Sequence, residues 1–188
     1  MAKVLRLELK AGDILIHDSS KTVSHCGLVI KNFDVAHATS NGMLCNDAGE
    51  WLKHSDVWRP KNLLDGMEDR LDKIGRLITK DGTKTEHGTT RAGISWFGSS
   101  SFGDKARGRL ATYRLRMELA ESKTKDQVIM KNVFCSELVI VCYQLACKDE
   151  NSRHFIKLDG KHTMPKNLRA YLDEDKTYWE KAGEYGTT

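Results

Sequence analysis

Short apolar runs separated by polar turns predict strands in the first third of the chain. "GDILIHD" (12–18), "SHCGLVI" (24–30) and "DVAHATS" (34–40) are each rich in aliphatic residues and bounded by turn-forming residues. Because only a few residues connect these runs, we expect an antiparallel meander. "SDVWRPKN" (55–62) predicts a fourth strand that ends at Pro60, since proline cannot donate to a β-ladder.

Apolar residues at helical spacing predict helices in the rest of the chain. Residues 67–78 place Leu, Ile, Leu and Ile on one face, and residues 109–122 are also expected to be helical. A third helix is expected from Cys135, and a short last helix within 163–172. The apolar stripe of the third helix consists of Leu138, Val139, Val141, Cys142, Leu145 and Ala146.

The middle of the chain has no clear period. Residues 79–108 are rich in Gly, Ser and Thr and contain Trp96, Phe97 and Phe102, which predicts a long loop. Such aromatics can close over a ligand, but we favour a role in fastening the loop to the protein body. We expect one domain over residues 1–188, with an extended insertion at about 62–130.

Composition narrows the class of protein. The chain has 188 residues, 39% hydrophobic and 30% charged, as in ordinary globular proteins. The net charge of +4, from 30 basic and 26 acidic residues, is too balanced to favour nucleic-acid binding. No apolar run is long enough to cross a bilayer, so no stable membrane insertion is expected. The N-terminus resembles no secretory signal, so we expect synthesis in the cytoplasm.

Five cysteines are present, and no two of them form a CxxC pair. Structural zinc usually needs four ligands in paired spacings, so no metal is expected. A disulfide framework is equally unexpected in a cytosolic product of this size. Cys142 and Cys147 are therefore expected to be buried and to act as small hydrophobic residues.

Cys135 is the best candidate for a nucleophile. It opens a predicted helix, where free backbone N–H groups and the helix dipole stabilise a thiolate. Asn132 lies just upstream and is a candidate cap. His25 and His37 lie in neighbouring predicted strands, so they can be cross-strand neighbours. One imidazole would act as the base and the other would orient it, although each histidine alone is more often a structural residue.

The remaining reactive residues are less favoured. Cys26 follows His25, and strand alternation is expected to point its side chain to the opposite face. His17 with Asp18 is expected to end a strand in a solvated turn, and Glu137 to cap the helix or pair with a neighbour. Four further histidines lie in polar stretches and are expected at the surface: His54, His87, His154 and His162.

The order "GDILIHD…SHCGLVI…DVAHATSNG…FCSELVIVCY" resembles the circularly permuted papain-like cysteine hydrolases. These are permuted NlpC-type families, including the YiiX/YebB-like group, with lecithin:retinol acyltransferase-like enzymes as relatives. "VWRP" and "TMPKNL" resemble later segments of the same families, so the resemblance covers about 12–60 and 133–172. It implies an α+β, permuted papain-like fold, in which an antiparallel sheet packs against a helix bearing the nucleophilic cysteine.

The resemblance also implies a role for each residue. Cys135 of "FCSEL" matches the nucleophile, His25 of "SHCGLVI" the general base, and His37 of "VAHA" the orienting third residue. Such enzymes act through an acyl-enzyme and require no metal or organic cofactor. The interval of 37 − 25 = 12 residues between the histidines resembles the acyltransferase-like branch.

Peptidoglycan peptides are the expected substrate of an amidase or endopeptidase of this type. Without a signal peptide, such an enzyme would need delivery to the periplasm of a target cell. A type VI-like antibacterial toxin fits, with a secretion apparatus and an immunity protein as partners. The alternatives are a lipid acyl hydrolase or acyltransferase, a protein-modifying deamidase or protease, and a non-catalytic binding module.

Overall fold

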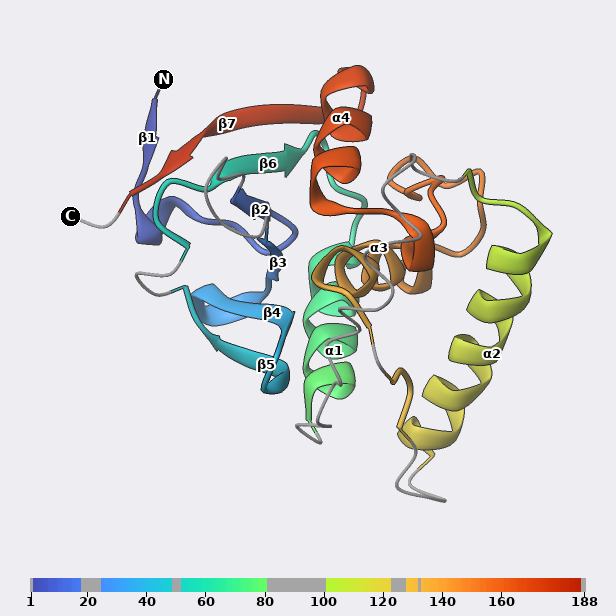
Figure 1. Cartoon of the computed structure of the whole chain (residues 1–188). Coiled ribbons are helices and arrows are strands. Elements are labelled where there is room, and N and C mark those ends of the chain that lie inside the picture. Colours follow the sequence, from blue (N-terminus) through green and yellow to red (C-terminus); the bar gives the residue numbers. More distant parts are fainter. Residues whose placement is uncertain are drawn as a thin grey trace.

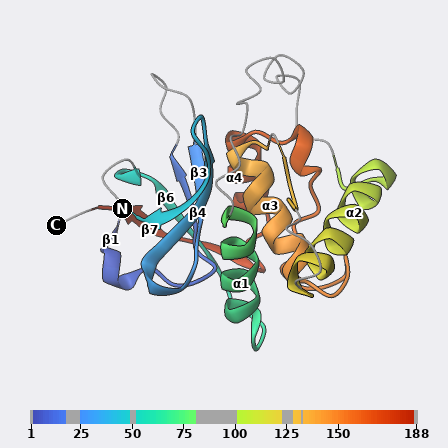
Figure 2. The same ribbon diagram turned by 90° about the horizontal axis from the view of Figure 1, so that it is seen from below.

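A computed structural model describes residues 2–17, 25–48, 52–80, 101–122, 128–131 and 133–186. Within these ranges the fold is α+β, with one mixed, mostly antiparallel sheet of seven strands and four α-helices on one side of it (Figures 1 and 2). The strands are β1 Lys3–Val4, β2 Ile14–His17, β3 His25–Val29, β4 Asp34–Thr39, β5 Gly42–Asp47, β6 Asp56–Pro60 and β7 Trp179–Tyr185. The helices are α1 Met67–Thr79, α2 Asp104–Glu121, α3 Cys135–Ala146 and α4 Pro165–Glu174.

The sheet order is β1-β7-β6-β2-β3-β4-β5, and only the pair β1–β7 is parallel. The predicted meander of β2, β3 and β4 is confirmed, as is the strand that ends at Pro60. Strands β1, β5 and β7 were not predicted. Strand β5 follows a two-residue connection, because Thr39 pairs with Gly42. The Asn-Gly pair at 41–42 is a known hairpin signal that could have revealed it.

Two apolar cores cover the two faces of the sheet. Alternate strand residues such as Ile16, Leu28 and Ala36 face α1 and α3. Their neighbours, such as Leu15 and Val35, form a smaller core on the other face. A fully buried aliphatic side chain of this kind contributes roughly 1.5–3 kcal/mol to folding. The sheet is therefore fixed on both sides.

Helix α3 starts at Cys135 as predicted, but it is buried all round rather than along a stripe. The reason is its central position: strands β3 and β4 contact one side, and α1, α2 and α4 contact the others (Figure 2). Two of its polar side chains donate to backbone carbonyls of neighbouring segments. Ser136 Oγ donates to the carbonyl of Thr163 at 2.5 Å, and Gln144 Nε2 donates to the carbonyls of Ile156 and Leu158. This packing positions the helix that begins with Cys135.

Helices α1 and α4 agree with the predicted ranges to within two residues. Helix α2 begins five residues earlier than predicted, at Asp104, whose carboxylate suits the positive end of a helix dipole. The predicted loop is therefore shorter, and residues 81–100, with Trp96 and Phe97, lie outside the described residues. Phe102 packs edge-to-face on Phe155, with ring centroids 4.9 Å apart, which fastens this segment to the body.

Candidate active site

Cys135 is the first residue of α3 and is only 6% exposed. The preceding Phe134 occupies the N-cap position and makes no side-chain cap hydrogen bond. The N–H groups of the first turn have no partner within the helix, and together with the helix dipole they favour negative charge. The suggested cap Asn132 lies outside the described residues. The helix end can therefore stabilise a thiolate and, later, an oxyanion.

Contacts from β3 hold the pKa of Cys135 well below its ordinary value. The largest contribution is a hydrogen bond from the Cys26 side chain, and His25 adds a hydrogen bond and its charge. The backbone N–H of Cys26 also donates to Cys135. Burial acts in the opposite direction, because desolvation disfavours a thiolate, but these contacts outweigh it. Cys135 is therefore the thiol of this pair that ionises.

Cys26 remains protonated beside it. Its side chain is fully buried, and burial raises its pKa well above the ordinary value, with further contributions from the hydrogen bond to Cys135 and the charge there. The predicted alternation of β3 holds, but Cys26 nevertheless contacts the candidate nucleophile. Alternation does place Cys26 opposite Gly27 and Val29, but the helix lies on the Cys26 side of the sheet.

His37 supports His25 from the middle of β4. The Nε2 atom of His25 lies 3.2 Å from Nδ1 of His37, and the rings are edge-to-face with centroids 5.4 Å apart. His37 is 2% exposed, and burial lowers its pKa to about 4, although its hydrogen bond with Asn46 opposes this shift and the charge of His25 reinforces it. His37 is thus neutral at neutral pH and holds the ring of His25 without competing for its proton.

The structure therefore brings Cys135, His25 and His37 together, as the sequence predicted. The sequence did not predict Asn46, whose Oδ1 lies 2.8 Å from Nε2 of His37. Asn46 extends the hydrogen-bonded series Cys135–His25–His37 by one residue. The Asn-Gly pair at 41–42, where β5 begins, was the only signal, and it indicates a strand rather than a role for Asn46.

Gly27 allows β3 and β4 to approach one another next to these histidines. A Cβ atom at this position would lie 2.5 Å from Val35 Cγ1 and 3.4 Å from His37 Cβ. The β3–β4 ladder contains only the pairs Leu28–Ala36 and Val29–Val35. Cys26 lies beyond it, which leaves the Cys26 N–H available for Cys135. Gly27 is therefore part of what positions the site.

The other candidates have structural roles. Glu137 is 2% exposed and accepts a hydrogen bond from the Tyr113 hydroxyl at 3.4 Å, so the expected pairing with a neighbour is confirmed. Cys142 and Cys147 are buried, as predicted. His17 ends β2, directly opposite His25 in the ladder, while Asp18 lies outside the described residues.

The expected surface position is correct for His54, whose side chain is 77% exposed, while His162 is half-buried. It is wrong for His154, which is 1% exposed. Its ring packs between Tyr178 and Trp179, and its Nε2–H donates to the carbonyl of Lys61, so a polar sequence context concealed a core residue. His87 lies outside the described residues.

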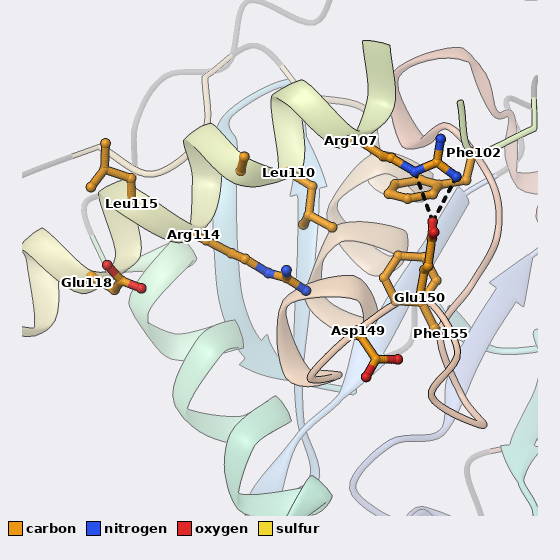
Figure 3. A pocket seen from close by; sticks show the side chains of 10 residues that line it. Phe102, Arg107, Leu110, Arg114, Leu115, Glu118, Asp149, Glu150 and Phe155 are labelled. Atoms are coloured by element: carbon orange, nitrogen blue, oxygen red, sulfur yellow. Dashed lines mark hydrogen bonds and ion pairs between the residues drawn. The ribbon is translucent and has the colours of Figure 1, made fainter. Parts of the chain in front are cut away.

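A pocket of about 470 Å³ lies apart from these residues, between α2 and the segment that follows α3 (Figure 3). Arg107 stacks over Phe102 and pairs with Glu150 at 2.9 Å, and Arg114 projects from the same helix. The pocket is lined by neither cysteine nor histidine. It therefore offers no thiol or imidazole, and the candidate cysteine site is at the start of α3.

Among the described residues, no group of three or more His, Cys, Asp or Glu side chains is arranged to hold a metal ion. No helix in those residues is long and apolar enough to cross a lipid bilayer. Comparison with protein families, with curated proteins and with solved structures gave no match to this chain.

Proposed function

We propose that this protein is a cysteine hydrolase in which Cys135 is the nucleophile, His25 the general base and His37 the residue that orients His25. The observation that carries the proposal is the hydrogen-bonded series from Cys135 through His25 to His37, formed at the start of a buried helix. A thiol is activated when a base contacts it and a third group orients that base.

The proposed reaction follows from these positions. His25 takes the thiol proton, which gives a thiolate–imidazolium pair. Cys135 Sγ then attacks an acyl carbonyl, and the N–H groups of the first turn of α3 stabilise the oxyanion. His25 returns the proton to the leaving amine or alcohol, which departs as the acyl-enzyme forms. Water, activated by His25, then attacks the thioester and regenerates Cys135.

The fold we propose for this chemistry is the circularly permuted papain-like fold of the NlpC-type families. The α+β architecture supports it, since an antiparallel sheet contacts the helix that begins with the nucleophile. The chain order also supports it, because both histidines precede the cysteine by about a hundred residues. The substrate class of those families makes a peptide bond of peptidoglycan the first substrate to test.

Lipid acyl hydrolysis or transfer is the second candidate. The observation that favours it is the direct contact of two imidazoles, His25 and His37, 3.2 Å apart, because a Cys-His-His series resembles the lecithin:retinol acyltransferase-like branch. In that case the acyl group would come from a lipid ester, and the acceptor would be water, an amine or an alcohol.

Incubation with purified peptidoglycan, followed by mass spectrometry of the soluble fragments, tests the first candidate. Wild type should release stem or cross-bridge peptides, and Cys135→Ala and His25→Ala should not. His54→Ala is the matched control, because His54 is an exposed histidine that pairs with Glu184 and has no part in the proposed site. Release by Cys135→Ala would refute the proposal. Release of fatty acid from phospholipid vesicles, with no peptide release, would favour the second candidate.

A further inference from the structure

We propose that Asn46 is a positioning residue, which sets the proton positions of both imidazoles so that Nδ1 of His25 faces Cys135 as the base. This inference rests on the proposed function, since it assumes that Cys135 is the nucleophile. It extends the Cys135–His25–His37 series by one residue and assigns an atom to each step.

The geometry places Asn46 at the end of a continuous series. Asn46 pairs with Val35 across β4 and β5, whereas His37 pairs with Leu44. Residues 35 and 37 of a strand share a face, so Asn46 is the diagonal neighbour of His37 on that face. The Asn46 Oδ1–His37 Nε2 distance is 2.8 Å, and the His37 Nδ1–His25 Nε2 distance is 3.2 Å.

The donor and acceptor roles of the nitrogens of His37 and His25 then follow from the amide oxygen of Asn46. An amide oxygen can only accept, so Nε2 of His37 must carry the hydrogen. Neutral His37 consequently has a bare Nδ1, which accepts from Nε2–H of His25. That leaves Nδ1 of His25 as the acceptor for the Cys135 thiol. During activation one proton moves, from Cys135 Sγ to His25 Nδ1, and every other hydrogen bond keeps its direction.

The opposite amide orientation does not support this chemistry. If Nδ2 of Asn46 donated to His37 Nε2, the hydrogen of His37 would lie on Nδ1, facing His25. A protonated His25 would then meet His37 donor to donor, which disfavours the imidazolium. Protonation of His37 would not remove this conflict, because an imidazolium carries hydrogen on both ring nitrogens. Only the oxygen of Asn46 therefore stabilises protonated His25.

The alternative is a purely structural role, in which Asn46 only joins β4 to β5. The two roles differ in the pH profile of Cys135 alkylation, measured with iodoacetamide and peptide mass spectrometry on the full chain. The groups in contact with the Cys135 thiol are His25 and Cys26, and a charge on Cys135 acts in turn on His37. The profile needs no substrate, and the melting temperature of each variant is recorded alongside it.

Asn46→Ala removes the acceptor and should raise the midpoint of the profile by about one pH unit, a roughly tenfold slower reaction near pH 6. Asn46→Asp keeps an acceptor oxygen in the same place and should retain the wild-type midpoint or lower it. Asp47→Ala is the matched control, since it removes a polar contact to Arg6 from the same strand and should leave the midpoint unchanged.

An unchanged midpoint in Asn46→Ala would overturn the positioning role while leaving the nucleophile intact. Asn46→Asp behaving like Asn46→Ala would also overturn it, because the oxygen would then not be the atom that matters. If Cys135 of wild type reacts only at the alkaline pH of an ordinary thiol, the proposed function fails and this role with it. The two failures are therefore distinguishable in one experiment.

Discussion

At the residue scale, the site depends on a competition around one sulfur atom. Burial alone would keep Cys135 protonated, as it does for Cys142, whose pKa burial raises to about 12. Both residues lie in α3, but only Cys135 lies at the helix start and contacts His25 and Cys26. Local hydrogen bonds, not burial or helix membership, therefore distinguish a candidate nucleophile from an inert core thiol.

The contact with Cys26 gives the first prediction. Cys26→Ala removes the largest contribution to the lowered pKa of Cys135, so alkylation of Cys135 near pH 6 should slow about fivefold, the effect of one hydrogen bond. Cys26→Ser restores a donor and should recover most of the rate. Cys142→Ala is the control, because it removes a buried thiol elsewhere on α3. Equal rates for Cys26→Ala and wild type would refute this role.

The sequence was sufficient to predict which residues meet wherever that follows from their place in an element. Cys135 and the two histidines were predicted from a helix start and neighbouring strands. Cys26 was misjudged because alternation tells which residues share a face but not which face a helix covers. Asn46 was missed because its role depends on a diagonal contact between two strands, which needs the register of both.

At the element scale, one buried ion pair links the residue before β2 to β6. Asp13, just before β2, is fully buried, and Arg59 of β6 donates to both of its carboxylate oxygens at 2.7–2.8 Å. Because β2 pairs with both β3 and β6, this contact fixes the strand next to the one that carries His25.

Loss of that ion pair should therefore lower the stability of the fold. Arg59→Ala leaves an unpaired buried carboxylate and should lower the free energy of unfolding by about 3–5 kcal/mol, measured by urea denaturation. Lys73→Ala, which breaks a pair with Glu121 at the surface, should change it by less than about 1 kcal/mol. Similar losses in the two variants would show that Asp13 is less isolated from water than its burial indicates.

Helices with an apolar sequence pattern were predictable, whereas strand β7, which depends on distant pairing, was not. Helix α1 has apolar residues at helical spacing, and α3 is apolar over most of its length. Strand β7 has no such pattern, because "WEKAGEY" carries charges and a glycine and is held by pairing with β6 across a bulge between Val57 and Trp58. Its strand conformation comes from a partner about 120 residues away in sequence.

At the scale of the whole molecule, two buried neutral histidines predict acid sensitivity. Burial lowers the pKa of His37 to about 4 and also lowers that of His154. In the unfolded chain both would titrate near 6.5, so the unfolded state binds more protons than the folded state once the pH falls below about 6.5. The contribution of these two neutral histidines to the free energy of unfolding is thus fully present above about pH 6.5, and it falls as the pH decreases toward 4.

As the pH falls from about 6.5 toward 4, the free energy of unfolding should decrease by about 2 kcal/mol or more. This corresponds to a fall of roughly 5 °C in melting temperature. Thermal unfolding followed by tryptophan fluorescence from pH 7 to 4.5 measures it. His37→Gln combined with His154→Gln removes both titrations and should reduce the slope of melting temperature against pH. Parallel curves for the double variant and wild type would assign the acid sensitivity to other groups.

The central claim is that Cys135 is an activated thiol whose activation depends on His25. The most direct measurement is the rate of iodoacetamide alkylation at each of the five cysteines near pH 6.5, in wild type and in His25→Ala. The account predicts that Cys135 of wild type reacts much faster than the partly exposed Cys45, and that His25→Ala abolishes this difference. Alkylation of Cys135 that is no faster than that of Cys45, or that is unaffected by His25→Ala, would contradict the account.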